Sequence, residues 1–185
     1  MDRLDKSLQC IRQLLAEKDR VIVAIDGNCA SGKTTLTAQL AEHFDCNVFH
    51  MDDFFLRPEQ RTPQRYEETG GNIDYERFHQ EVLLPLQTGN AFSYRPFDCS
   101  TFTLEEPVAV TPKKLTLIEG SYSHHPYFGN TYDLKILLTI DSGTQRQRIL
   151  ERPAFLQERF FSLWIPMENR YLEAFQIAEK ADLVL

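Results

Sequence analysis

Apolar positions along the chain follow two spacings, and their order predicts alternating helices and strands. Leucine and isoleucine recur at positions 4, 8, 11 and 15, so we expect an amphipathic helix over residues 3–17 that covers a sheet. Short runs rich in aliphatic residues follow, and such runs are typical of buried parallel strands. They span residues 21–25, 47–50, 115–118, 134–140 and 183–185. This order predicts an α/β fold with a mostly parallel five-stranded sheet.

A long insertion, about residues 54–113, separates the second and third expected strands. It contains a helical pattern near Tyr75–Leu86 and an extended region over residues 91–110 that would form a hairpin. A large excursion next to strand ends is where a substrate pocket is normally built. The chain of 185 residues fits a single domain, and it shows no internal repeat and no linker.

Residues Gly27 to Thr34 read Gly-Asn-Cys-Ala-Ser-Gly-Lys-Thr, which completes the phosphate-loop pattern G-x-x-x-x-G-K-T. An expected strand precedes it and a helical pattern follows it, as the motif requires. The two glycines let backbone N–H groups curl around phosphate oxygens, and the helix N-terminus adds positive charge. Lys33 should reach the β- and γ-phosphates, and the Thr34 hydroxyl should ligate Mg²⁺. The predicted fold is therefore the three-layer P-loop NTPase fold.

This loop predicts a site for a nucleoside triphosphate. We expect the nucleotide to be ATP, bound with Mg²⁺. The residues expected to bind the nucleotide are Gly27, Asn28, Cys29, Ala30, Ser31, Gly32, Lys33, Thr34 and Thr35.

Acidic residues follow two of the expected strands at the edge where parallel strands end. Asp52 and Asp53 come after the second strand, and Glu119 ends the third. Near a γ-phosphate, Asp52 or Asp53 can accept the proton of a substrate hydroxyl or hold Mg²⁺. The alternative is a plain helix cap or turn. Together with Thr34, Asp52 and Glu119 are the expected Mg²⁺ ligands.

The segments GNCASGKTT, HMDDFF, GGNIDYERF and IEGSY, in this order, resemble the uridine kinase branch of the P-loop kinases. That branch includes relatives acting on phosphoribulose, pantothenate and nicotinamide riboside. The resemblance covers roughly residues 20–185 of a chain that we expect to form one kinase domain over residues 1–185. It implies that Asp52 is the catalytic base. It also implies that Phe54 and Phe55 line the acceptor pocket and that Asp74 hydrogen-bonds ribose hydroxyls.

Two departures from the family pattern concern the acceptor. Ile73 stands where the family has an aromatic residue. The segment from Tyr94, a further expected acceptor-binding residue, to Cys99 lacks the histidine that uridine kinases place near the base. We therefore expect looser base selectivity than in uridine kinases.

Arginines gather after the fourth expected strand, in a stretch over residues 144–165 that we call the lid segment. Arg148 and Arg152 are four residues apart, so on a helix they share one face. Guanidinium groups on such a face can clamp the transferring phosphate oxygens, and in the family arginines here form a mobile lid. The alternative is a solvated face paired with Glu151 and Glu158. The expected catalytic residues are therefore Asp52, Lys33, Arg148 and Arg152.

Composition narrows the possible partners. The net charge of −7 disfavours nucleic acid, and no apolar run is long enough to span a membrane. The N-terminus does not read as a signal peptide. Four scattered cysteines argue against a zinc site or a disulfide scaffold, so we expect a cytoplasmic protein. The predicted partners are ATP and a small-molecule acceptor, and assembly as a homo-oligomer is left open.

We therefore expect an ATP-dependent phosphotransferase acting on a hydroxyl of a small molecule, with a nucleoside as the foremost acceptor. Pantothenate, nicotinamide riboside or another small alcohol is the alternative acceptor. A nucleotide-binding regulatory ATPase module is the alternative of another class, although it would need only the loop. A GTPase switch is disfavoured, because no Asn-Lys-x-Asp tetrad follows the fourth strand.

Overall fold

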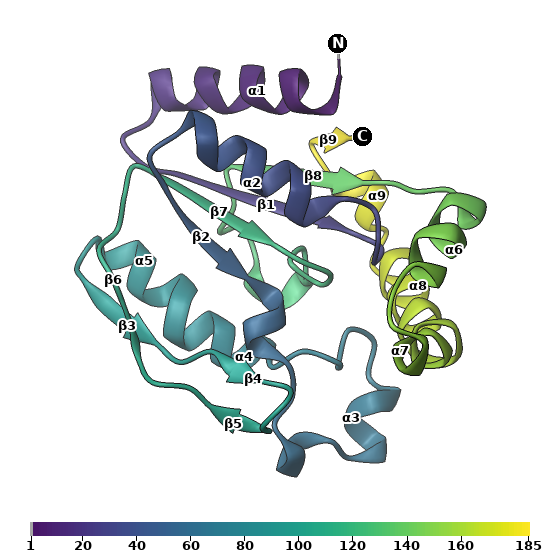
Figure 1. Cartoon of the computed structure of the whole chain (residues 1–185). Coiled ribbons are helices and arrows are strands. Elements are labelled where there is room, and N and C mark those ends of the chain that lie inside the picture. Colours follow the sequence, from purple (N-terminus) through teal and green to yellow (C-terminus); the bar gives the residue numbers. More distant parts are fainter. Residues whose placement is uncertain (1) are drawn as a thin grey trace.

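The computed structural model describes residues 2–185 and has three layers, with a parallel sheet between two sets of helices (Figure 1). The strands lie in the order β2-β7-β1-β8-β9, and every neighbouring pair is parallel. Their bounds are β1 Val21–Gly27, β2 Cys46–His50, β7 Leu115–Glu119, β8 Leu134–Leu138 and β9 Leu183–Val184. The predicted α/β fold with a five-stranded parallel sheet is confirmed. The fourth strand ends at Leu138, two residues before the expected end.

Helices α1 (Arg3–Glu17) and α2 (Lys33–His43) cover one face of the sheet (Figure 1). Ile11 and Leu40 are completely buried there against strand residues such as Val23, because both helices place an apolar stripe toward the sheet. Helix α1 has the bounds that the apolar spacing predicted. The Asp2 carboxylate caps it by accepting a hydrogen bond from the Asp5 amide at 2.8 Å.

The insertion contributes the helices on the opposite face. A continuous helical run comprises α4 (Tyr75–Phe78), a π-helical turn (His79–Leu83) and α5 (Leu84–Thr88). Its apolar side chains share a core with α8 (Ile165–Ala174) and α9 (Ile177–Lys180). The extended region is a long hairpin, as its sequence pattern predicts. It pairs β3 (Phe92–Tyr94) with β6 (Val108–Val110), and β4 (Phe97–Asp98) with β5 (Thr103–Leu104).

The lid segment lies at the carboxyl ends of β1 and β8 (Figure 1). It includes most of α6 (Ser142–Leu150), all of α7 (Ala154–Arg159) and a π-helical turn (Phe160–Trp164) that leads into α8. Pro166 is the second residue after this turn, and Pro85 is the second residue after the other π-helical turn. Because proline has no N–H to donate, the wider turn before it accommodates the missing helical hydrogen bond. No helix within residues 2–185 combines the length and apolar character that crossing a bilayer demands.

Candidate active site

The phosphate loop joins the end of β1 to the start of α2, and its two glycines are required by geometry. Gly27 has a φ of +142°, and a Cβ built on it would lie 2.2 Å from the Leu138 carbonyl oxygen. Gly32 has a φ of +99° at the N-cap of α2, in the left-handed region that glycine alone enters without strain. The loop conformation therefore depends on the glycines at both ends of the motif.

A cavity of about 880 Å³ opens at the carboxyl ends of the strands, where ligands bind in open α/β sheets. The phosphate loop forms one end of it, through residues 29–35. Arg148 and Arg152, the two predicted lid arginines, line it from α6 and the residues that follow. Asp52, Phe55 and residues of the insertion complete the wall. The volume lies within the range that small-molecule sites occupy.

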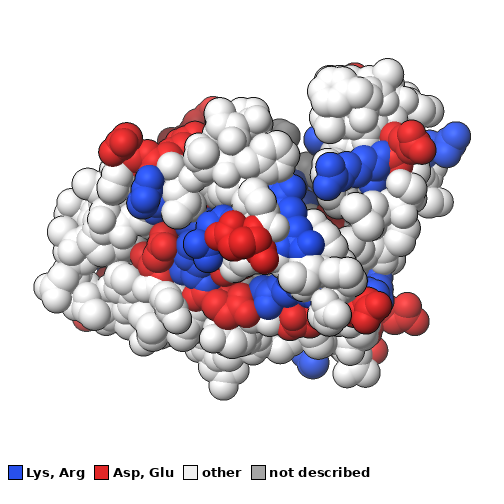
Figure 2. Space-filling view, turned by 90° about the horizontal axis from the view of Figure 1, so that it is seen from below, with Lys and Arg blue, Asp and Glu red and all other residues white. Residues whose placement is uncertain are grey.

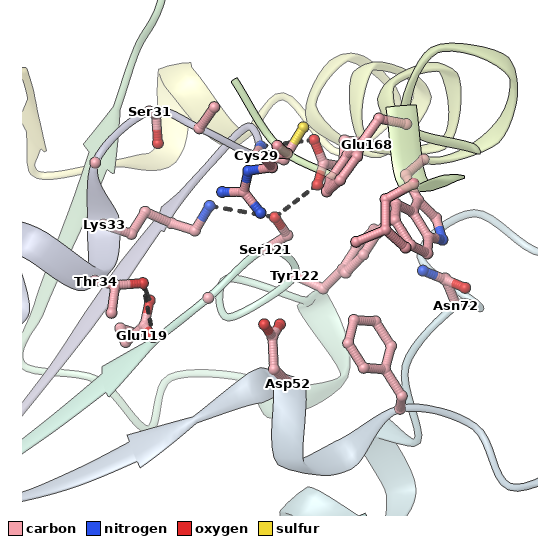
Figure 3. Close-up of a pocket in the computed structure, with 18 of the residues that line it drawn as sticks. Cys29, Ser31, Lys33, Thr34, Asp52, Asn72, Glu119, Ser121, Tyr122 and Glu168 are labelled. Atoms are coloured by element: carbon pink, nitrogen blue, oxygen red, sulfur yellow. Dashed lines mark hydrogen bonds between the residues drawn. The ribbon is translucent and has the colours of Figure 1, made fainter. Parts of the chain in front are cut away.

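Lys33 is almost fully buried under the phosphate loop. Its ammonium group donates hydrogen bonds to the carbonyl oxygens of Gly27 (2.8 Å) and Asn28 (3.0 Å). It also lies 3.3 Å from the hydroxyl oxygen of Ser121, to which it points in Figure 3. Gly27 and Asn28 thus contribute through their carbonyl groups, and they hold Lys33 at the cavity wall.

Thr34 and Glu119 lie together as candidate Mg²⁺ ligands, the hydroxyl oxygen 3.3 Å and 3.4 Å from the two carboxylate oxygens (Figure 3). Hard oxygen donors beside a phosphate loop fit Mg²⁺, which completes its shell with waters and phosphate oxygens. No cluster of three or more His, Cys, Asp or Glu side chains suited to a metal occurs between residues 2 and 185.

Glu119 also binds His50, which lies opposite it in the β2–β7 register. The His50 Nδ1 atom is 2.6 Å from a Glu119 carboxylate oxygen. This hydrogen bond raises the pKa of His50 above its ordinary value of 6.5, although burial acts in the opposite direction. The protonated imidazolium is therefore favoured in the folded protein.

The raised His50 pKa predicts a pH-dependent contribution to stability. A group whose pKa is higher in the folded state stabilises the folded protein fully at pH values below its unfolded pKa, which is about 6.5 for histidine. This contribution disappears as the pH rises through the pKa of the folded state. We expect His50→Gln to lower the free energy of unfolding more at pH 5.5 than at pH 8.5. Urea unfolding at both pH values measures this difference. His43→Gln, which changes an exposed side chain on α2, is the control. Equal losses at both pH values would contradict the assignment.

Asp52 faces the cavity from the 3₁₀ turn Met51–Phe54 that follows β2 (Figure 3). Its side chain is exposed within the cavity, where the atoms of the surrounding walls partly desolvate the carboxylate. This desolvation raises the Asp52 pKa, the negative charge of Glu119 raises it further, and the positive charge of Lys33 opposes both. A carboxyl group whose pKa moves toward neutrality is better matched to accepting a hydroxyl proton.

Asp53 has a different environment from Asp52. The Tyr94 hydroxyl donates a hydrogen bond to its carboxylate at 3.4 Å, and the Arg77 guanidinium donates to its backbone carbonyl at 2.8 Å. Among the described residues, Asp53 is not part of the cavity wall. The 3₁₀ turn therefore directs Asp52 into the cavity, whereas Asp53 contacts residues of the insertion.

Three of the predicted acceptor-binding residues pack behind the cavity wall. Phe54 is completely buried between Phe78 and Tyr94. Tyr94 holds Asp53, as described above. The Asp74 carboxylate caps α4 through the Arg77 amide at 3.1 Å, and it lies 3.6 Å from the Arg77 Nε atom. Phe55 and Asp52 are the predicted acceptor-binding residues that line the cavity, and the neighbour of Asp74 that does so is Asn72.

Glu168 is a buried part of the site that the sequence did not indicate. It lies on α8, and its carboxylate accepts hydrogen bonds from the Cys29 amide and the Ser121 hydroxyl, both at 2.8 Å (Figure 3). Its partners are some 47 and 139 positions away, so no local pattern marks it. The apolar spacing of Met167 and Tyr171 on α8 could have shown that this face of the helix is buried.

The charge of Glu168 also affects the Cys29 thiol. Burial raises the pKa of Cys29 to about 12, and the nearby Glu168 carboxylate adds to the shift. The thiol therefore stays protonated at neutral pH, although it lines the cavity.

Asp26, in β1, connects this strand to the loop after β7 and to α8. Its buried carboxylate accepts hydrogen bonds from the His124 amide (2.8 Å) and from the Tyr171 hydroxyl (2.7 Å). The first contact belongs to the loop after β7 and the second to α8. Asp26 is thus a structural carboxylate that fixes α8, and with it Glu168, against the phosphate loop.

Comparisons with known proteins show similarity to curated kinases. The chain is 27% identical over 173 residues to a protein named uridine kinase from Anoxybacillus flavithermus, covering 84% of this chain and 82% of that protein. It is 25% identical over 173 residues to a uridine kinase from a Geobacillus species, with the same coverage. No protein-family model matches the chain.

Solved structures show the same fold. A possible uridine kinase from Bacillus stearothermophilus superposes with a TM-score of 0.72 at 23% identity, covering 100% of this chain and 97% of that one. A D-glycerate 3-kinase from Cryptococcus neoformans superposes with a TM-score of 0.65 at 14% identity, covering 98% and 88%.

The fold and the phosphate-loop site define a P-loop kinase of a small molecule. Within that class, the chain is similar to proteins named uridine kinase, and the predicted resemblance to the uridine kinase-like P-loop kinases is confirmed.

Proposed function

We propose that this protein transfers the γ-phosphate of ATP to a hydroxyl group of a small molecule, with a nucleoside as the foremost acceptor. The observation that carries the proposal is that Asp52 faces Lys33 and the Thr34–Glu119 pair in one cavity. A regulatory nucleotide-binding module would need the loop but no carboxylate opposite it. The names of the curated relatives support the nucleoside.

Within this proposal the chain's own residues position the two substrates. The amides of residues 29–35 and the ammonium group of Lys33 bind the triphosphate, and Arg148 and Arg152 close over it from the lid segment. Asp52 accepts the proton of the acceptor hydroxyl. Thr34 and Glu119 would hold Mg²⁺, which supplies charge neutralisation at the phosphate oxygens when bound. Most of the rate enhancement then comes from positioning and electrostatics.

An ADP-release assay across a panel of acceptors tests the proposal. We expect faster ADP release with ribonucleosides than with 2′-deoxyribonucleosides. A deoxyribonucleoside lacks the hydroxyl that would pair with a buried polar group of the site, and leaving that group unpaired weakens binding. No acceptor-dependent release across nucleosides, pantothenate and sugar alcohols would contradict the kinase function.

Two variants assign the preference for ribose to a residue. Asp74→Ala abolishes the preference if Asp74 binds the hydroxyls, as the family resemblance implies. Asn72→Ala abolishes it if the cavity-lining residue does so instead. Release with pantothenate and with no nucleoside would refute the nucleoside and leave the kinase function standing.

A further inference from the structure

Arg61 places a positive charge in the part of the cavity that the insertion builds. It follows the short turn Pro58–Gln60, and its Nε atom donates a hydrogen bond to the Leu56 carbonyl oxygen at 2.9 Å. The guanidinium carbon lies 5.0 Å from the centre of the Phe102 ring and 5.9 Å from that of Phe97. One hydrogen bond and two aromatic rings therefore fix its orientation.

Arg61 has no acidic partner within residues 2–185. The neighbouring arginines of the insertion, Arg57, Arg65 and Arg77, each form an ion pair with a carboxylate. The terminal nitrogens of Arg61 donate no hydrogen bond to the described protein atoms. The chain has a net charge of −7 and therefore many acidic side chains, so a lack of carboxylates does not explain why Arg61 has no ion-pair partner. A partly buried guanidinium without a counter-charge is costly, and a ligand can supply that charge.

Arg61 lines the cavity from the insertion and not from the phosphate loop. Helix α3 (Pro63–Glu67), which begins two residues later, lies beyond the end of β2 as seen from α2 (Figure 1). Arg61 and Asp52 both line the cavity, together with Cys99 on the β4–β5 turn.

The cavity as a whole has more cationic than acidic side chains in its wall. Lys and Arg side chains gather across the middle of the face shown in Figure 2, with Asp and Glu side chains among them. The cationic residues of the cavity are Arg3, Lys33, Arg61, Arg148, Arg152 and Arg159, and the acidic ones are Asp52, Glu119, Glu151 and Glu168. Arg3 and Arg148 hydrogen-bond carbonyl oxygens of the phosphate loop, whereas Arg61 belongs to the insertion.

We propose that Arg61 binds an anionic group of the acceptor, a carboxylate or a phosphate ester, and that the alcohol phosphorylated by this protein carries such a group. The fork of guanidinium donors matches both groups with two parallel hydrogen bonds. The inference rests on the kinase function proposed above and narrows its acceptor. An uncharged nucleoside would leave Arg61 without a counter-charge, whereas a ribosyl compound with an acidic substituent would satisfy it.

Matched pairs of acceptors that differ in one anionic group test the proposal. The pairs are uridine and orotidine, panthenol and pantothenate, and ribose and ribose 5-phosphate. We expect the anionic member of at least one pair to have a kcat/KM at least tenfold higher than its neutral counterpart. The first two pairs detect a carboxylate and the third a phosphate ester. Equal or better turnover of the neutral member in every pair would overturn the inference while leaving the kinase function intact.

The variant Arg61→Gln tests the residue. We expect it to raise KM for the anionic acceptor roughly 10- to 100-fold, the range for a lost charge-assisted hydrogen bond, and to leave KM for ATP unchanged. Arg61→Lys should recover part of the loss, because the charge remains without the planar fork. Arg95→Gln is the matched control, since it removes a positive charge from the same insertion outside the cavity wall.

Direct binding separates failure of this inference from failure of the kinase function. Calorimetric titration of the anionic probes into wild type and Arg61→Gln needs no turnover. Weaker binding to the variant supports the anion site even if no ADP is released, and equal binding overturns it. A thermal unfolding midpoint close to that of the wild type shows that Arg61→Gln is folded. If Arg61→Gln does not fold, the same titrations are carried out with Arg61→Lys.

Discussion

Replacing Asp52 with asparagine is expected to lower kcat roughly 10²- to 10⁴-fold, the usual range for losing a general base. The amide keeps the size of the side chain but cannot accept the hydroxyl proton. Affinity for ATP should change little, because Asp52 comes from the turn after β2 and the phosphate loop from β1. Steady-state rates with saturating ATP and acceptor, together with a nucleotide titration, measure both quantities.

Asp53→Asn is the matched control for this substitution. It changes a neighbouring carboxylate that the Tyr94 hydroxyl holds outside the cavity wall, so we expect a far smaller loss of rate. The pH–rate profile adds a second readout. The raised Asp52 pKa predicts that the rate falls on the acid side as Asp52 becomes protonated, and that this limb is absent in the variant. A large loss in Asp53→Asn with a small loss in Asp52→Asn would reverse the assignment of the two aspartates.

The second large effect is expected for Lys33→Ala, which should abolish phosphoryl transfer. Without the ammonium group, the charge that develops on the β- and γ-phosphate oxygens has no partner at the base of the loop. The fold should persist, because the contacts of Lys33 are confined to the phosphate loop and Ser121.

ADP release and circular dichroism together test the Lys33 prediction. Lys6→Ala, which removes an exposed lysine from α1, is the control and should retain wild-type turnover. Turnover by a folded Lys33→Ala protein at the wild-type rate would show that the triphosphate binds elsewhere.

Local signals in the sequence were sufficient for the five strands, for α1 and α2 and for the phosphate loop. A buried strand, two glycines with fixed spacing and an amphipathic helix are properties of neighbouring residues, so their pattern predicts β1, the loop and α2 directly. The positions of Asp52 and Glu119 followed in the same way, because parallel strands that end at one edge bring their last residues together. Both residues line the cavity in the structure.

The orientation of other side chains could not be predicted from the sequence, because it depends on packing between distant segments. Whether Phe54 or Phe55 faces the cavity depends on the rotation of a 3₁₀ turn, which is set by packing against Phe78 and Tyr94. Asp74 satisfies a local rule for capping α4, and this role cannot be told from ribose binding by sequence alone.

By itself, then, the sequence determined the parallel sheet, the phosphate loop and the carboxylates at the strand ends, since these follow from periodicity and from short-range backbone geometry. Only the tertiary structure decided that Glu168 reaches the Cys29 amide and that Arg61 lines the cavity without an acidic partner among residues 2–185. These features arise where segments far apart in the chain pack together. Their contacts depend on the docking of α8 and of the hairpin, which no local pattern encodes.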